Sequence, residues 1–271
     1  MAQPFDRHRG ERAVPRALIE VVEETASTNA DLVRRLGAGE PIPEGYWLQA
    51  IRQNAGRGRR GREWVSREGN LTCSTVVNLH AGDPAVHTLA FVAALAVHDV
   101  VAEELARRQA NPSGQGSDQS RQAASEERVV LKWPNDVLIN GAKVCGILLE
   151  RVGDHVVAGI GINIAYAPEV AGRATTSLRA AGSGMEAREA LEGLAARFSI
   201  RLTQWRFEGL PAILGEWQRR ASAIGRPLLV MLDEEGMLAG AFAGLDPDGA
   251  LRLRLADGTL RVIYAGDVSL V

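Results

Sequence analysis

Four arginines alternate with glycines in the stretch NAGRGRRGREW (54–64); they are Arg57, Arg59, Arg60 and Arg62. Such a stretch cannot form a stable helix or strand, because glycine disfavours both and the four guanidinium groups repel one another. We predict a mobile cationic loop that folds over a bound anion. The alternative is a solvated run of charge, which is the commonest role of a basic cluster.

The chain contains two lysines among its 31 basic residues, and both lie in the segment KWPNDVLINGAK. Every other Lys or Arg position in the chain is arginine. A retained lysine therefore suggests a site that needs the compact charge of an ammonium group and not the wider, planar guanidinium group. We therefore predict that Lys132 or Lys143 is functional. The alternative is that both are neutral remnants of a sequence that has drifted towards arginine.

Two further patterns concern the backbone beside these side chains. Pro134 ends a strand, and Asn135 and Asp136 are expected to bond local backbone in the turn that follows. In the stretch GIGIN, Gly159 and Gly161 leave room for backbone or ligand to approach closely. A lone Gly-x-Gly pair without its dinucleotide-fold context is no evidence for that fold, and a tightly packed strand is the alternative.

Hydrophobic periodicity predicts the elements that position these residues. Helices are expected at 27–37, 85–108 and 185–221. Strands are expected at 45–53, 71–79, 128–133, 144–152 and 155–164. From Gly225 onward, short strands alternate with tight turns such as Asp248-Gly249 and Asp257-Gly258, a pattern typical of a small SH3-like barrel.

Two segments lack such patterns. Residues 1–19 form a loose N-terminal segment, and 109–128 is a polar, low-complexity stretch that we interpret as a flexible surface insertion without chemistry. Beyond them the remaining sequence divides into a large domain, 20–221, and a small one, 222–271.

Composition narrows the class of protein. The net charge is −2, and no apolar run is long enough to span a membrane or to form a secretory signal. Cys73 and Cys145 lie in apolar strand-like stretches, which favours buried free thiols in a reducing cytoplasm. The five histidines show no metal-ligand spacing, so any metal is expected to arrive with a ligand, and we predict no metal-binding side chains.

Taken together, the motifs STN, Q-x-x-G-R-G-R-x-G-R-x-W, KWPND, K-x-x-G-I-L-x-E, GIGIN and ATTSL resemble those of the biotin protein ligases, over residues 20 to 271. The resemblance implies an α/β (α+β) fold: a mixed-sheet catalytic domain like those of class II aminoacyl-tRNA synthetases and lipoate ligases, followed by the SH3-like barrel. It also implies that biotin and Mg-ATP react to give biotinyl-5′-AMP. The biotin is then passed to one lysine of a biotin carboxyl carrier protein.

The resemblance also assigns site residues. Ser27, Thr28 and Asn29 would meet the ureido end of biotin, and Gln53, Arg57, Gly58 and Arg59 would contact biotin from the loop. Lys132 and Arg57 would be catalytic, with Lys132 between the biotin carboxylate and the α-phosphate. Arg60, Lys143 and Asn163 would serve the nucleotide, Trp64 would anchor the loop, and Thr175, Thr176 and Ser177 would lie near adenine.

Other interpretations remain open at this point. A lipoate-type ligase shares the activation chemistry, although the arginine-rich loop favours biotin. A nucleic-acid-binding module would also use guanidinium groups, but the near-neutral charge argues against DNA as a partner. About 20 residues precede the large domain, which is too few for a DNA-binding repressor module, so we expect a ligase without repressor activity. The chain is expected to be a monomer or a homodimer.

Overall fold

The computed structural model of the chain describes residues 17–110, 129–232 and 236–270. Most of the expected N-terminal segment 1–19 and of the expected insertion 109–128 lies outside the described residues. Within the described ranges, no helix combines the length and the apolar character needed to cross a bilayer.

The larger part of the chain is built on a seven-stranded mixed sheet of order β1-β2-β3-β7-β6-β5-β4. Its strands are β1 (Leu18–Thr25), β2 (Tyr46–Gln53), β3 (Leu71–Asn78), β4 (Val129–Lys132), β5 (Asp136–Ile139), β6 (Ala142–Val152) and β7 (His155–Ile162). Strands β1 and β2 are parallel and every other neighbouring pair is antiparallel. This is the mixed sheet that the motifs led us to expect.

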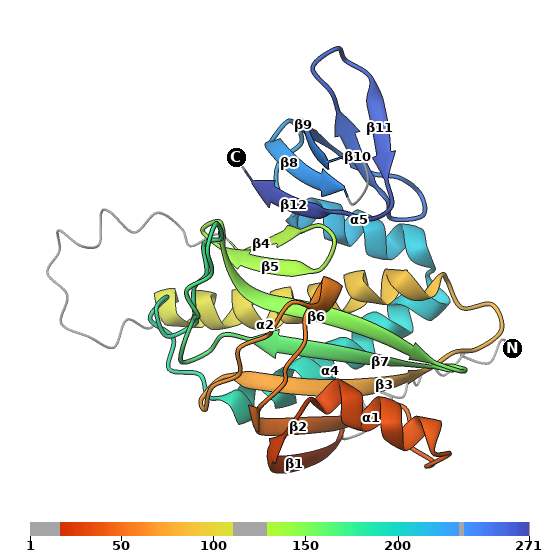
Figure 1. The fold of residues 1–271 in the computed structure, drawn as a ribbon, viewed down its shortest axis with the longest axis vertical. Helices are drawn as coiled ribbons and strands as arrows, with labels where there is room; N and C mark the ends of the chain where they lie inside the picture. Colours follow the sequence, from red (N-terminus) through yellow and green to blue (C-terminus); the bar gives the residue numbers. More distant parts are fainter. Residues whose placement is uncertain (1–16, 111–128, 233–235, 271) are drawn as a thin grey trace, which may run out of the picture.

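Helices cover both faces of this sheet (Figure 1). Helix α1 (Thr28–Gly37) packs on one face against β3, β6 and β7. The opposite face carries α2 (Leu89–Ala110), α4 (Ala187–Phe207) and α5 (Leu210–Arg220), with a short 3₁₀ turn, η2 (Val86–Thr88), before α2. Helix α2 is buried over much of its circumference, as expected of a helix between a sheet and a second helix layer.

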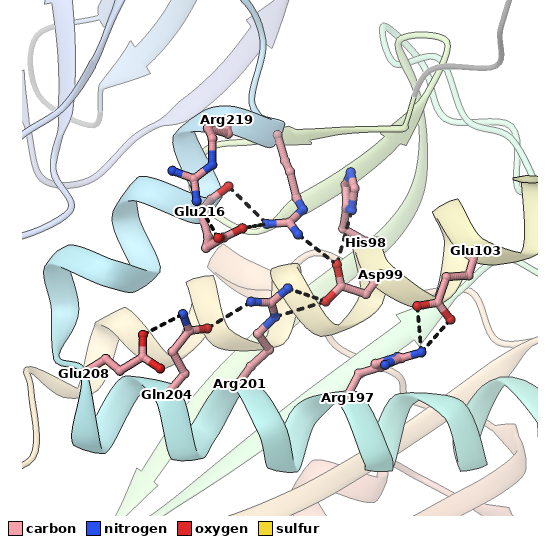
Figure 2. A network of polar contacts seen from close by, with 10 residues as sticks. His98, Asp99, Glu103, Arg197, Arg201, Gln204, Glu208, Glu216 and Arg219 are labelled. Atoms are coloured by element: carbon pink, nitrogen blue, oxygen red, sulfur yellow. Dashed lines mark hydrogen bonds and ion pairs between the residues drawn. The ribbon is translucent and has the colours of Figure 1, made fainter.

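A polar network joins the three helices of that face (Figure 2). The Asp99 carboxylate of α2 accepts hydrogen bonds from Nε and Nη2 of Arg201 in α4, at 3.0 and 2.7 Å, and lies 3.4 Å from Arg220 of α5. Burial alone would raise the pKa of Asp99, but His98 and the two guanidinium groups lower it. The network fixes α5, which leads directly into the C-terminal sheet.

The C-terminal part forms a five-stranded antiparallel sheet of order β11-β10-β9-β8-β12, shown in blue in Figure 1. Its strands are β8 (Pro227–Leu232), β9 (Gly236–Leu245), β10 (Leu251–Arg254), β11 (Leu260–Ile263) and β12 (Asp267–Leu270). Gly249 and Gly258 have φ of +90° and +86°, so the two predicted turns are real and need glycine there.

Three expectations about elements were wrong. Strands β1 and β5 were not expected, and the helix predicted at 185–221 is two helices. The break lies at Gly209, whose φ is +80°, while Pro211 is accommodated in the first turn of α5, where no backbone donor is lost.

Candidate active site

A cavity of about 380 Å³ lies where the N-terminus of α1, strands β6 and β7 and the loop 54–64 meet the start of β12. Its volume is that of a small-molecule site. Most residues that the resemblance assigned to biotin, nucleotide or loop anchoring line it: Ser27, Thr28, Asn29, Gln53, Arg57, Gly58, Arg59, Arg60, Trp64, Lys143, Asn163 and Thr175. Lys132, Thr176 and Ser177 do not line it.

One polar wall is the start of α1. Ser27 has an extended backbone and its Oγ accepts a hydrogen bond from the Ala30 amide at 3.4 Å, which caps the helix. The backbone amide and the hydroxyl of Thr28 both donate to Oε1 of Gln53, at 2.8 and 3.1 Å. The motif STN is therefore both a helix cap and a set of fixed donors and acceptors at the cavity.

Asn29 is held by partners on three strands. Its Oδ1 accepts from the Ser74 hydroxyl on β3 at 2.6 Å, and its Nδ2 donates to Glu150 on β6 at 2.7 Å. A Cβ added to Gly159 on β7 would lie only 2.2 Å from Asn29 Oδ1. The first glycine of GIGIN thus makes room for this side chain, as the close-approach interpretation predicts.

The second glycine of that motif makes room for Trp64. A Cβ on Gly161 would lie 2.3 Å from the indole, and one on Gly146 would lie 3.0 Å from it. The indole therefore lies flat on two adjacent strands where neither strand has a side chain. The Lys143 ammonium lies 5.7 Å from the centroid of the Trp64 ring, within the range of a cation–π interaction. Trp64 thus packs the end of the loop against these two strands and forms part of the cavity wall.

The cationic loop is a narrow hairpin over the cavity. The Gly58 amide donates to Arg62 O at 2.7 Å, the Trp64 amide donates to Gly56 O at 2.9 Å, and Arg57 and Glu63 form an isolated bridge. A short 3₁₀ turn, η1 (Arg59–Gly61), forms its tip. The loop has no α-helix or long strand, as predicted, but it is more regular than a structureless loop.

Two contacts fasten this hairpin. The Arg59 Nη1 donates to Asn135 Oδ1 at 3.3 Å, and Arg62 pairs with Asp267 of β12 at 2.6 Å. Asp267 is also paired with Arg173, so this first residue of β12 forms ion pairs with two guanidinium groups at the rim of the cavity. Burial lowers the pKa of Arg59, and the neighbouring Arg60 lowers it further. The Arg59 charge is thus poorly compensated by protein groups.

Asp136 lies between the two lysines. Its carboxylate is 2.9 Å from Lys132 Nζ and 2.5 Å from Lys143 Nζ, and the side chain is almost fully buried. Burial alone would raise the pKa of Asp136, but the two ammonium groups lower it. Asp136 therefore remains a carboxylate and fixes the position of Lys143 beside the cavity.

The sequence-based interpretation of this turn was wrong in one respect and incomplete in another. Asp136 and Asn135 do not bond local backbone; Asn135 Nδ2 donates across to Ile147 O on β6 at 2.6 Å. Lys132 does have the partner that a buried lysine needs, but it also donates to Val268 O on β12 at 2.9 Å. Lys132 thus lies behind Asp136 and does not line the cavity.

Asn163 and Thr175 form another part of the lining. Asn163 Nδ2 donates to Thr176 O at 3.1 Å, whereas its buried Oδ1 accepts no hydrogen bond from the described residues. Thr175 lines the cavity and pairs through an isolated bridge with Lys143, and Ser177 is buried and caps the following turn. An unsatisfied buried acceptor of this kind is available to a ligand donor or a cation.

The cavity is electropositive. Six basic side chains and three carboxylates line it, and two of the carboxylates, Asp136 and Asp267, already have two basic partners each. Cys73 also lines it, and burial raises the pKa of this thiol, so it is an inert wall. Within the described part of the chain no cluster of His, Cys, Asp and Glu could hold a metal. The site is therefore built for an anionic ligand.

Comparison with known proteins defines the class. The biotin/lipoate A/B protein ligase family matches residues 22–164, and the biotin protein ligase C-terminal domain matches residues 224–271. The chain belongs to the biotin/lipoate A/B protein ligase family. Within that family its relatives are biotin ligases: it is 36% identical to the biotin–[acetyl-CoA-carboxylase] ligase of Paracoccus denitrificans, over 92% of this chain and 98% of the relative.

Solved structures agree with that placement. The biotin protein ligase of Aquifex aeolicus in complex with biotin and ATP superposes with a TM-score of 0.73 at 26% identity, covering 94% of this chain and 98% of the other. The Leishmania major ligase in complex with biotinyl-5-AMP has a TM-score of 0.61 at 27% identity, covering 93% of this chain and 100% of the other.

Several residues of the site could not be found from the sequence. Ser74, Arg173 and Asp267 come from three separate segments and contact the site only through the fold. Glu150 was visible as the last residue of K-x-x-G-I-L-x-E, but its hydrogen bond with Asn29 was not. Asp136 was visible in KWPND, but its role as the partner of both lysines was not. A buried carboxylate four residues after a buried lysine was the signal available.

Proposed function

We infer that this protein is an ATP-dependent biotin protein ligase that first forms biotinyl-5′-AMP and then biotinylates a lysine of a carrier protein. The main observation behind this inference is that one cavity has a neutral polar wall at the start of α1 and a cationic region formed by the hairpin and Lys143. Relatives of the chain are ligases for biotin, and structures of similar fold hold biotin with ATP or the adenylate.

We assign the polar wall to the uncharged end of biotin. A ureido group has two N–H donors and one carbonyl acceptor, and Thr28, Asn29 and Gln53 offer matching groups whose positions are fixed by hydrogen bonds. Trp64, lying flat on the strands at Gly161 and Gly146, supplies an apolar wall for the ring system.

We assign the activation step to Lys143 and the hairpin arginines. A carboxylate oxygen of biotin attacks the α-phosphate, a new C–O–P linkage forms, and pyrophosphate leaves with the electrons of the broken P–O bond. Two anions must approach each other, so positive charge fixed in advance lowers the barrier. Lys143, held by Asp136, and Arg57 and Arg59 in the loop are so placed, whereas Lys132 acts by holding Asp136.

Mg²⁺ would accompany ATP. The described cavity offers no set of carboxylates for it, so the phosphates would supply most of its oxygen ligands. Asn163 Oδ1, which is buried and has no hydrogen-bond partner among the residues that the structure describes, fits a neutral oxygen contact to the metal or to the nucleotide.

The second step transfers biotin to the carrier. The neutral amine of a carrier lysine attacks the mixed anhydride, and AMP leaves with the electron pair of the C–O bond. The carrier would be the biotin carboxyl carrier protein of an acetyl-CoA carboxylase, because the relatives are named biotin–[acetyl-CoA-carboxylase] ligases. A closed hairpin would shield the adenylate from water until the carrier arrives.

The proposal is tested by ATP–pyrophosphate exchange. The purified chain is supplied with Mg-ATP and labelled pyrophosphate and then with biotin, lipoate or octanoate in separate reactions. Exchange that depends on biotin, and is weak with the other acids, is expected. Exchange that prefers lipoate would assign the chain to the lipoate branch of the family. If none of the three acids supported exchange, the proposed activation chemistry would be rejected.

A further inference from the structure

A second cavity, of about 790 Å³, adjoins the first. It is bounded by the start of α2, the turn after β4, the middle of β6 and two turns of the C-terminal sheet. Four residues line both cavities: Arg59, Asn135, Ile147 and Leu148. The two spaces therefore share one wall, which these four residues form.

This wall has one fixed part and one part that can move. Asn135 is fixed to β6, because its Nδ2 donates to Ile147 O at 2.6 Å and its backbone carbonyl accepts from the Ile147 amide at 3.2 Å. Arg59 belongs to the glycine-rich hairpin and its contact with the wall is one hydrogen bond of 3.3 Å to Asn135. Displacing the Arg59 side chain would join the two cavities without disturbing the sheet.

The frame of the second cavity is rigid. Trp133 Nε1 donates to Gly249 O at 3.0 Å, and His87 Nε2 lies 3.0 Å from Asp248 O. Both η2, which precedes α2, and the turn after β4 are thus fastened to the same turn of the C-terminal sheet. Tyr264, which is 73% exposed, stands at the other side of the opening.

The lining suits a lysine that must react as a neutral amine. Apolar side chains dominate it, including Val86, Phe91, Trp133 and Pro134, and would pack on the methylene stem. A largely apolar lining and nearby guanidinium groups favour the neutral amine over the ammonium ion. The Asp83 carboxylate also lines the cavity, but it already pairs with Arg206 at 3.4 Å. Arg59 supplies one of these guanidinium groups at the place where the amine would pass into the ligand cavity.

We propose that the second cavity admits the acceptor lysine of the carrier protein and that this lysine reaches the adenylate past Arg59. This rests on the proposed ligase function. The ammonium loses one proton to bulk water on entry. The amine nitrogen then bonds to the biotinyl carbonyl carbon, the bond from that carbon to the phosphate oxygen breaks, AMP departs, and the second proton goes to water.

Two variants test the proposal outside the ligand cavity. Ala85 is exposed and lines the second cavity, so Ala85→Trp fills it without disturbing the core, and Tyr264→Ala removes one side of its opening. Ala196→Trp, on an exposed position of α4, and Phe207→Ala, 85% exposed, are the matched controls. Melting temperatures are compared for all four.

Three activities are measured for each variant: biotin-dependent pyrophosphate exchange, reaction of the bound adenylate with hydroxylamine, and transfer to an unbiotinylated carrier domain of acetyl-CoA carboxylase. We expect Ala85→Trp to lower kcat/KM for the carrier by more than about tenfold, and Tyr264→Ala by about threefold or more. Exchange, hydroxylamine reaction and both controls should stay within about twofold of wild type.

Unchanged carrier transfer in both variants would overturn the proposal, because the lysine would then enter elsewhere. A parallel fall in exchange and transfer would also overturn it, since the second cavity would then serve the small ligands. A changed oligomeric state by light scattering, with transfer intact, would assign the surface to a second copy of the chain. Absence of biotin-dependent exchange in wild type would instead remove the proposed function, and this inference with it.

Discussion

The Lys143 ammonium and the Asp136 carboxylate lie 2.5 Å apart at the wall of the first cavity, which Lys143 lines and Lys132 does not. Lys132 also forms an ion pair with this carboxylate, from a position outside the cavity lining. The sequence-based assignment gave the charge beside the biotin carboxylate to Lys132, whereas the structure supports giving it to Lys143.

We expect Lys143→Arg to be much more harmful than Lys132→Arg. A Cβ on Gly146 would lie 3.0 Å from Lys143 Nζ, so the space around this ammonium is too small for the wider guanidinium group of arginine. Loss of one preorganised charge should lower single-turnover adenylate formation by about 10²–10³-fold. Lys132→Arg should cost less than about tenfold, because Lys132 does not line the cavity. The reverse order would restore the assignment to Lys132.

Asp136→Asn should destabilise the protein by about 3 kcal/mol at neutral pH, since it leaves two ammonium groups without their buried counter-charge. The pKa of Asp136 is lowered in the folded state, so its contribution is present above the unfolded pKa of about 3.9 and is lost as pH falls through the folded value. Urea unfolding of both proteins at several pH values checks this. A difference that is unchanged well below pH 4 would contradict it.

Gly161→Ala should displace Trp64 and open the cavity wall. The added methyl would lie 2.3 Å from the indole, an overlap that costs about 1–3 kcal/mol. Biotin affinity, measured by calorimetry, should fall by about tenfold or more. Gly184→Ala is the control, because a Cβ there meets no atom within 4 Å.

A double-mutant cycle separates this steric effect from a general weakening of β7. If the clash with the indole is the cause, Gly161→Ala should cost little more stability when Trp64 is already alanine. Additive losses in the two backgrounds would mean that the methyl group disturbs the strand and not the indole.

Asp267→Asn should loosen the hairpin over the ligand. It weakens the pairs with Arg62 and Arg173, and both pairs are partly exposed, so each is worth at most about 1 kcal/mol. Release of bound biotinyl-5′-AMP should therefore be faster by about threefold to tenfold. Trypsin cleavage after the hairpin arginines should increase in parallel. Asp154→Asn, at an exposed turn, should change neither measurement.

Sequence patterns predicted most of the fold because the long elements have strong periodicity. Strands β2, β3, β6 and β7 are apolar runs bounded by turn residues, and the Ser27 cap marks the start of α1. Strand β1 was missed because it is a sheet edge with exposed residues on both faces. Strand β5 was missed because it is four residues long and begins only two residues after Pro134.

Most of the candidate site residues lie around one cavity, but their arrangement in it could not be predicted from the sequence. The residues of STN, the loop and GIGIN come together as the motifs imply. Which lysine faces the ligand depends on a register shift between β5 and β6 at Val137 and Leu138, and a shift of one residue moves a side chain to the other face. Asp267 could not be found at all, because its contact with Arg62 joins segments 205 residues apart.

The measurement that tests the account most directly combines both half-reactions in one experiment. The chain is incubated with biotin, Mg-ATP and an unbiotinylated carrier domain of acetyl-CoA carboxylase, and the products are analysed by intact-mass spectrometry and nucleotide chromatography. The account predicts one biotinyl group on one carrier lysine, with AMP and pyrophosphate as products, and none of these with Lys143→Arg on the same timescale. ADP as the nucleotide product, or an unmodified carrier beside an active reference ligase, would contradict it.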